Sequence, residues 1–261
     1  MNLKVNVMDI LLTNDDGIHA MGLCALYEAF RSAGFNVQVV APDGERSAVG
    51  HAITLSDPIK IKKVYKSGDL FGWAINGTPA DCVKLGVNAL LDKRPDVVVS
   101  GINRGANTGI NVLYSGTVSA ATEASILGIP SVAVSLDSYQ DYDYCFSAYF
   151  VSALLKKIKN KNQHCFSLNI NIPALPANQI KGIKVTRQCI KPFKEKFEKR
   201  VDPRGNIYYW QCSSQIDWTK HKGTDIYWLK KGFITVTPLK FDLTDEVCLE
   251  TVGSLLENIE L

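Results

Sequence analysis

The sequence has no long hydrophobic run, no Cys-x-x-Cys pair and little excess charge of either sign. No stretch approaches the roughly 18 uncharged apolar residues that a membrane-spanning helix needs, so we expect no membrane span. The opening MNLKVNVMDILL has neither an extended apolar segment nor a small-residue cleavage site, which argues against a secretory signal. These absences predict a cytoplasmic protein that does not associate with a membrane.

The charge balance does not by itself imply electrostatic attraction to nucleic acid. Lys and Arg number 29 against 26 Asp and Glu, which is a net charge of +3. This mild excess does not by itself indicate nucleic-acid binding, and we expect no specific nucleic-acid partner. With 261 residues, 46% of them hydrophobic, the chain can bury a sizeable core. We expect one large domain, or one domain with an appendage.

The cysteines and histidines show no spacing typical of a metal site. An odd number of unpaired cysteines favours free, buried thiols in a reducing compartment, with a zinc site or a catalytic cysteine as the alternative. We expect the histidines to be structural or on the surface; they are His19, His51, His164 and His221. The seven cysteines are Cys24, Cys82, Cys145, Cys165, Cys189, Cys212 and Cys248.

Strand-like and helix-like segments alternate in the first half of the chain. Short runs rich in Val and Ile that alternate with helices indicate a parallel sheet covered on both faces. The pattern is that of an α/β protein and resembles a Rossmann-like three-layer sandwich with a mostly parallel sheet. The expected strands lie within 8–14, 36–42, 95–101 and 129–136, and the expected helices within 20–34, 78–91 and 117–128.

The pattern of residues changes after about residue 180. Two strand-like arms flank the turn DPRGN at 202–206, which predicts a hairpin. A helical turn and one more strand are expected within 223–244. We therefore divide the chain into a body, 1–180, and a carboxyl-terminal β extension and oligomerisation arm, 181–261. Residues 181–200 hold eight Lys or Arg against two Glu, which suits either a solvated arm or a site for RNA or polyphosphate.

Polar residues follow the expected strands, where parallel sheets bind their ligands. Asp15 and Asp16 stand side by side in TNDDG. A divalent cation would remove the repulsion between the two carboxylates, and a solvated turn is the alternative. In the loop after the next strand, Ser47 could offer a hydroxyl ligand and Arg46 a charge for an anion.

A second group of candidates lies in the glycine- and asparagine-rich stretch 100–117. Ser115 and Thr117 flank a predicted helix start, where unpaired N–H groups and hydroxyls suit a phosphate. The alternative is a plain Ser/Thr helix cap. Residues 76–78 also enter a helix, and a cap is the stronger interpretation there.

Several motifs together resemble the survival protein SurE family of 5′/3′-nucleotidases. They are ILLTNDDGIHAMGLCALYEAF, SGINRGANTG, YSGTVSAATEA, LNINIP, VDPRGNIYYW and GFITVTPL, in the order of the family, from about residue 9 to 245. The resemblance implies a Rossmann-like body and a carboxyl-terminal part that exchanges between protomers in a homodimer or homotetramer. It also implies a phosphatase of nucleoside 5′- and 3′-monophosphates with some activity on short polyphosphate.

Carried over by position, the resemblance assigns one divalent metal ion per subunit, Mg²⁺, Mn²⁺ or a similar ion. The implied metal ligands are Asp15, Asp16, Ser47 and Asn103. The implied phosphate-binding residues are Asn107, Ser115, Gly116 and Thr117.

The sequence leaves several questions open. Asp15 or Asp16 could serve as a general base or as a nucleophile, because geometry must separate these roles. The preferred nucleobase, the choice between 5′ and 3′ substrates, the metal and the subunit count are not determined. The alternative function is a nucleotide-binding sensor without catalysis, against which the paired carboxylates argue.

Overall fold

The computed structural model describes residues 7–140, 143–159, 166–191, 195–213, 217–257 and 259. A nine-stranded sheet forms its centre, in the order β3-β4-β2-β1-β5-β6-β7-β11-β8. The pairs β3–β4 and β7–β11 are antiparallel, and the other neighbours are parallel. The strands are β1 (Asp9–Thr13), β2 (Asn36–Pro42), β3 (Ile61–Lys66), β4 (Asp69–Ile75), β5 (Val97–Arg104), β6 (Ser131–Asp137), β7 (Ser167–Pro173), β8 (Ile183–Val185) and β11 (Ile234–Leu239).

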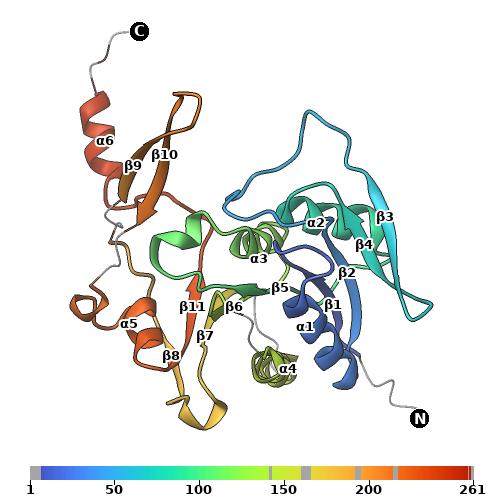
Figure 1. Cartoon of the computed structure of the whole chain (residues 1–261). Helices are drawn as coiled ribbons and strands as arrows, with labels where there is room; N and C mark the ends of the chain where they lie inside the picture. The colour runs from blue at the N-terminus through green and yellow to red at the C-terminus, as the bar shows by residue number, and fades with distance from the viewer. Residues whose placement is uncertain are drawn as a thin grey trace.

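Helices cover both faces of this sheet (Figure 1). On one face α1 packs against α4, and on the other α2 packs against α3. The helices are α1 (Met21–Ser32), α2 (Pro79–Leu85), α3 (Gly116–Ile126), α4 (Cys145–Lys159), α5 (Asp225–Lys230) and α6 (Leu249–Leu256), with short helical turns at Gly86–Leu90, Gly109–Leu113, Ala177–Gln179 and Trp218–Lys220. The predicted mostly parallel α/β sandwich is confirmed.

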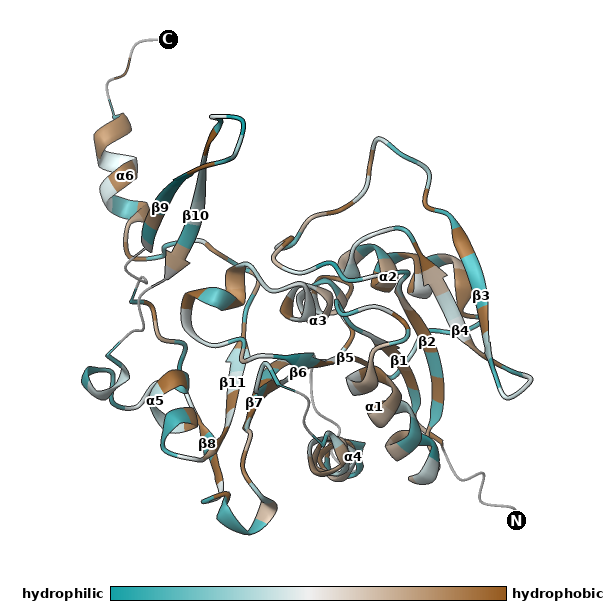
Figure 2. Ribbon diagram, in the orientation of Figure 1, coloured by the Kyte–Doolittle hydropathy of each residue, from teal (hydrophilic) through white to brown (hydrophobic). Residues whose placement is uncertain are grey.

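Among the described residues, the core consists of one large hydrophobic cluster on each face of the sheet and a smaller third cluster that includes Val118 and Ala133. On one face Leu12, Phe30 and Val151 are fully buried, and on the other Leu11, Val83 and Ala124. Leu11 and Leu12 are neighbours that enter opposite clusters, because successive side chains of a strand point to opposite faces. Figure 2 shows the resulting hydrophobic strands at the centre of the molecule.

Strands β3, β4 and β7 and helix α4 have no counterpart among the predicted segments. β3 reads IKKVYK, and its lysines suit an exposed edge rather than a buried strand. β4 contains Gly72, where an added Cβ would lie 2.4 Å from the carbonyl oxygen of Val39. A glycine inside a strand weakens the sequence pattern by which the strand could be predicted. Here it allows β4 to approach β2 closely. β8 and β11, which come after residue 180, join the same sheet.

The predicted hairpin is present as a separate two-stranded sheet, β9 (Glu195–Val201) and β10 (Ile207–Ser213), and from here on the arm means this hairpin alone. It stands away from the body beside α6 (Figure 1). Its aromatic residues Phe197, Tyr208, Tyr209 and Trp210 are exposed. Phe193, a further aromatic residue of this part of the sequence, lies outside the described residues.

The described cysteines are free, as predicted, but only some are buried. Cys82 and Cys189 are buried, whereas Cys145, Cys212 and Cys248 are exposed. The expectation of uniform burial was therefore wrong for these three, because they lie at a helix start, on the arm and before α6. Cys165 and His164 lie outside the described residues. In the part of the chain that the structure describes, no helix is long and apolar enough to cross a membrane.

Candidate active site

The first part of the site is the turn that follows β1. Asn14 closes this turn, since its side-chain Nδ2 donates to the Gly17 carbonyl oxygen at 2.9 Å. Gly17 has a φ of +97°, and an added Cβ would lie 3.1 Å from the Gly44 backbone. Only glycine combines that φ with so close a contact. The turn places the Asp15 carboxylate, which is 5% exposed, at the carboxyl end of the sheet.

The loop after β2 lies against this turn. The backbone N–H of Arg46 donates to the Asp15 carbonyl oxygen at 2.7 Å. This hydrogen bond ties the residue just before Ser47 to the turn that carries Asp15. The Ser47 hydroxyl donates to Oε1 of Glu45 at 2.5 Å. The Arg46 guanidinium bonds Asp43 at 3.0 Å and does not line the site's cavity. The suggestion that Arg46 offers a charge to an anion has no support in this arrangement.

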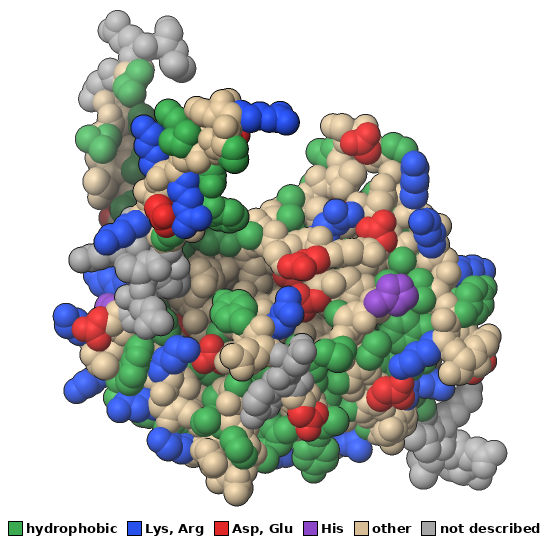
Figure 3. Space-filling model, viewed as in Figure 1, with side chains coloured by type: hydrophobic (Ala, Val, Ile, Leu, Met, Phe, Trp, Pro, Cys, Tyr) green, Lys and Arg blue, Asp and Glu red, His purple; other side chains and the backbone are tan. Residues whose placement is uncertain are grey.

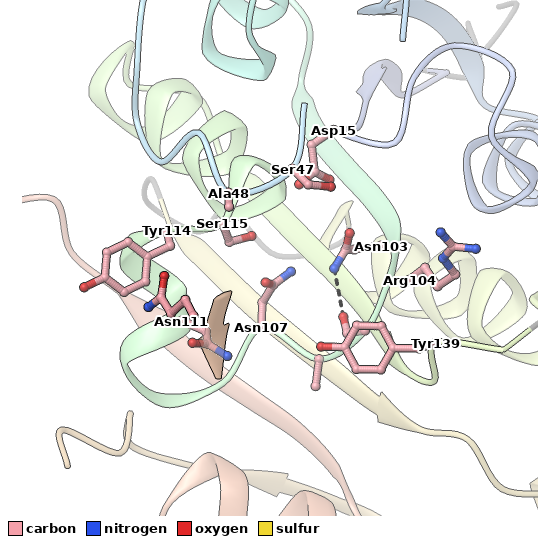
Figure 4. A pocket seen from close by; sticks show the side chains of 13 residues that line it. Asp15, Ser47, Ala48, Asn103, Arg104, Asn107, Asn111, Tyr114, Ser115 and Tyr139 are labelled. Atoms are coloured by element: carbon pink, nitrogen blue, oxygen red, sulfur yellow. Dashed lines mark hydrogen bonds between the residues drawn. The ribbon is translucent and has the colours of Figure 1, made fainter. Parts of the chain in front are cut away.

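Asn103 comes from the end of β5, just after a break in its pairing with β6. Its side-chain Nδ2 donates to the Gly105 carbonyl oxygen at 2.8 Å. This bond leaves the amide oxygen on the side of Asp15 and Ser47, as Figure 4 shows. β1 lies between β2 and β5, so the three strand ends bring these residues together.

The amino terminus of α3 faces Asp15 rather than open solvent. Thr117 donates both its hydroxyl and its backbone N–H to the Asp15 carboxylate. At Gly116, an added Cβ would lie 2.8 Å from Cβ of Asp15, so the helix can approach this closely only through glycine. Ser115 caps the helix by accepting from the Val118 N–H at 3.2 Å. The helix cap considered from the sequence is thus present.

These residues surround a cavity of about 520 Å³. Of the predicted site residues, Asp15, Ser47, Asn103, Asn107 and Ser115 line it. Figure 4 shows their side chains pointing toward a common space. Asp16, Gly116 and Thr117 do not line the cavity. They lie beside it through their contacts with Asp15. Direct contact of phosphate with Gly116 and Thr117 stays a prediction.

Residues that sequence reasoning missed complete the cavity. They are Ala48, Arg104, Gly105, Ala106, Asn111, Tyr114, Tyr139 and Gln211. Most belong to the asparagine-rich stretch already singled out, so position within that stretch was a usable signal. Tyr139 and Gln211 come from the end of β6 and from β10, and no local pattern marks them.

Burial dominates the electrostatics of the site. It raises the pKa of Asp15 despite the hydrogen bonds from Thr117. Burial, together with the neighbouring Asp15, raises the pKa of Asp16 to about 6. Glu45 adds a third negative charge that acts on both. The site therefore concentrates negative charge that its own residues do not fully compensate.

The donor chemistry fits a hard divalent cation. Two carboxylates, the Ser47 hydroxyl and the Asn103 amide oxygen are oxygen ligands of the kind that Mg²⁺ and Mn²⁺ prefer. Among the described residues, no three His, Cys, Asp or Glu side chains gather as a metal-binding group. A cation here would therefore rest on two carboxylates supplemented by neutral oxygens. Such a cation would also offset the burial and the nearby negative charge that raise the pKa of both aspartates.

The family model described as Survival protein SurE matches residues 10–195. The chain belongs to the survival protein SurE family. This membership confirms the resemblance seen in the strand-end motifs, and the matched range contains every predicted site residue.

Known SurE proteins match along almost the whole chain. The 5′-nucleotidase SurE of Syntrophobacter fumaroxidans is 49% identical over 94% of this chain and 98% of that protein. The 5′-nucleotidase SurE of Natranaerobius thermophilus is 48% identical over 91% of this chain and 95% of that protein. The crystal structure of the SurE protein from Aquifex aeolicus superposes with a TM-score of 0.84 at 42% identity, covering 95% of this chain and 99% of that one.

Proposed function

We propose that this protein is a divalent-metal-dependent phosphatase that hydrolyses nucleoside 5′- and 3′-monophosphates to nucleoside and phosphate, and that also cleaves short polyphosphate. The observation that carries the proposal is the buried Asp15 beside Asp16, at one end of a cavity that Ser47, Asn103 and Ser115 also line. Membership in the SurE family and the name 5′-nucleotidase of its relatives support the reaction class.

In the proposed reaction, Asp15, Asp16, Ser47 and Asn103 hold one metal ion per subunit. A bound divalent ion supplies neutralisation of phosphoryl charge and a more acidic water molecule. Thr117 keeps the Asp15 carboxylate oriented, and the Asn103 amide is oriented by Gly105. Asn107 and Ser115 present polar groups to the phosphate, because phosphoryl transfer depends mainly on positioning and charge stabilisation. Asp15 and Asp16 are the proposed catalytic residues, as base or nucleophile.

The rim of the cavity supports a nucleoside rather than a bare phosphate as substrate. Tyr114 and Tyr139 line it and are 55% and 77% exposed. Their rings lie on opposite sides in Figure 4. Tyr139 rests on Gly105, where an added Cβ would lie 2.6 Å from the ring. Exposed aromatic rings offer a face on which a nucleobase can stack.

The test is phosphate release from AMP, 3′-AMP, ribose 5-phosphate and short polyphosphate. Each substrate is measured after chelation and after adding back Mg²⁺ or Mn²⁺. We expect release from both nucleotides only with a metal, and a higher kcat/KM for AMP than for ribose 5-phosphate. Nucleotide binding without phosphate release would favour the sensor instead, and full activity after exhaustive chelation would exclude the metal.

We also propose that the protein is a homodimer or homotetramer of the cytoplasm. The apolar residues of α6 support assembly: Leu249, Val252, Leu255 and Leu256 are all at least 48% exposed. A short helix with an uncovered apolar stripe is not stable by itself, so a second surface must cover it. The free thiols of the described cysteines support a reducing compartment, which cell fractionation would test.

A further inference from the structure

The segment that carries Ser47 has few means of holding its own shape. Residues 47–49 and 51–52 are exposed, and the segment contributes no member to the hydrophobic clusters of the core. Ala48 has a φ of +55°, a left-handed backbone that residues with a Cβ rarely adopt. Such a conformation persists only where the surroundings hold it in place. The segment must therefore be fixed by specific contacts.

The contacts that follow Ser47 lead to helix α3. The backbone N–H of Gly50 donates to the Tyr114 carbonyl oxygen at 3.0 Å. One residue later, Nε2 of His51 lies 2.8 Å from Oε2 of Glu123. Glu123 is 4% exposed and belongs to α3, the helix whose start contacts Asp15. The loop that carries Ser47 is thus tied to the same helix that orients Asp15.

The Glu123 carboxylate has two separate partners, one on each oxygen. Oε2 faces His51, and Oε1 accepts from Lys84 of α2 at 3.0 Å. These contacts, the one from His51 first, lower the pKa of Glu123, so the carboxylate is ionised at neutral pH. Because an ionised carboxylate can only accept hydrogen bonds, Nε2 of His51 must carry the proton that is donated to Glu123. Lys84 remains as a counter-ion if His51 is removed.

We propose that His51 and Glu123 form a positioning pair that holds the Ser47 hydroxyl in place for the metal ion. The pair touches neither metal nor substrate and acts through the three residues, 48–50, that link Ser47 to His51. The inference rests on the proposed function, since it takes Ser47 as a metal ligand. Lys84 also binds the Glu123 carboxylate, but it does not belong to the loop that carries Ser47. Its only role here is therefore to balance the charge of Glu123.

The test compares His51→Ala, His51→Gln and Lys84→Met with the wild type. Mn²⁺ binding is measured by isothermal titration calorimetry in the absence of substrate, and kcat and KM for AMP are measured at saturating Mn²⁺. We expect His51→Ala to weaken Mn²⁺ binding by about tenfold, the lower end of the effect of losing a partner outside the ligand shell. The kcat at saturating Mn²⁺ should stay close to that of the wild type.

Two controls separate positioning from general damage. His51→Gln places an amide N–H near the position of Nε2 and should restore most of the Mn²⁺ affinity. Lys84→Met should leave that affinity unchanged, even if its melting temperature falls. Wild-type affinity in His51→Ala, or an equal loss in Lys84→Met, would overturn the positioning pair. A wild type that binds no Mn²⁺ would instead remove the proposed metal site itself.

Discussion

The body and the arm use similar hydrophobic residues in opposite ways. In the body, β1 and β5 are buried because helices cover both faces of the sheet. In the arm, Phe197, Tyr209 and Trp210 are each more than half exposed, on a hairpin that has no covering layer. Figure 3 shows hydrophobic side chains gathered on the arm where it projects from the body. The body completes its own core, whereas the arm leaves apolar surface for something else to cover.

The two regions nevertheless meet at the cavity. Its polar floor comes from strand ends of the body, and Gln211 of the arm contributes to its wall. Under the proposed function and assembly, chemistry and assembly would occupy separate elements that meet at this one boundary. Changes in the floor of the cavity should therefore affect turnover without assembly, and changes in the arm should affect assembly with only a modest effect on turnover.

The largest effect is expected from the carboxylates of the floor. Asp15→Asn and Asp16→Asn should each lower kcat/KM for AMP by more than the roughly 10- to 100-fold that loss of an outer-shell partner of a metal causes. Both variants should keep the fold and the assembly, because Asn conserves shape and removes only charge. Kinetics with added Mn²⁺ and light scattering check this. Substantial turnover in both variants would contradict the proposed metal site.

A somewhat smaller loss is expected at the start of α3. Ser115→Ala should lower kcat/KM by roughly tenfold to a hundredfold, the scale of a charge-assisted hydrogen bond. Thr117→Val should do the same by releasing the Asp15 carboxylate. Steady-state kinetics measure both effects. The controls Ser115→Thr and Thr117→Ser retain the hydroxyls and should remain near the wild type, and unchanged kinetics in Ser115→Ala would leave that residue only as a helix cap.

Replacing the arm tests the other half of the comparison. A short Gly-Ser turn in place of 195–213 should reduce the assembly size in light scattering, because it removes the exposed aromatic surface. The kcat/KM for AMP should fall only modestly, since one wall residue is lost. Gln211→Ala is the matched control and should reproduce the kinetic change with the assembly intact. A monomeric wild type, or an assembly size that ignores the replacement, would assign the arm another role.

The smallest effect concerns the stability of the body and its pH dependence. Hydrogen bonds lower the pKa of Glu123 below its ordinary value of 4.5, so folding favours the ionised form. Its contribution is present above pH 4.5 and is lost as the pH falls through the lowered value. Wild type should exceed Glu123→Gln by about 1–3 kcal/mol in unfolding free energy at pH 7. Urea denaturation should show this gap closing in acid, and a gap independent of pH would be the contrary result.

Local sequence pattern determined the body's central elements. Runs such as DILLT and VVVS predicted β1 and β5, and helical spacing with a final glycine predicted α1, because burial on a strand or helix repeats with a local period. The same reasoning placed Asp15, Asp16 and Ser115 at element ends. Strand–helix alternation then predicted the class of fold, as the sheet confirms.

Only the tertiary structure decided which of these ends meet. Thr117 reaches Asp15 across 102 positions, and Tyr139 and Gln211 reach the cavity from elements with no local mark of function. The local period of hydrophobic residues indicates which side chains are buried. It does not indicate which strand lies beside which. Strand order places β1 between β2 and β5 and so joins Ser47, Asp15 and Asn103 at one edge. The arm's sequence determined its hairpin, while the missing cover over its aromatic residues became visible only in three dimensions.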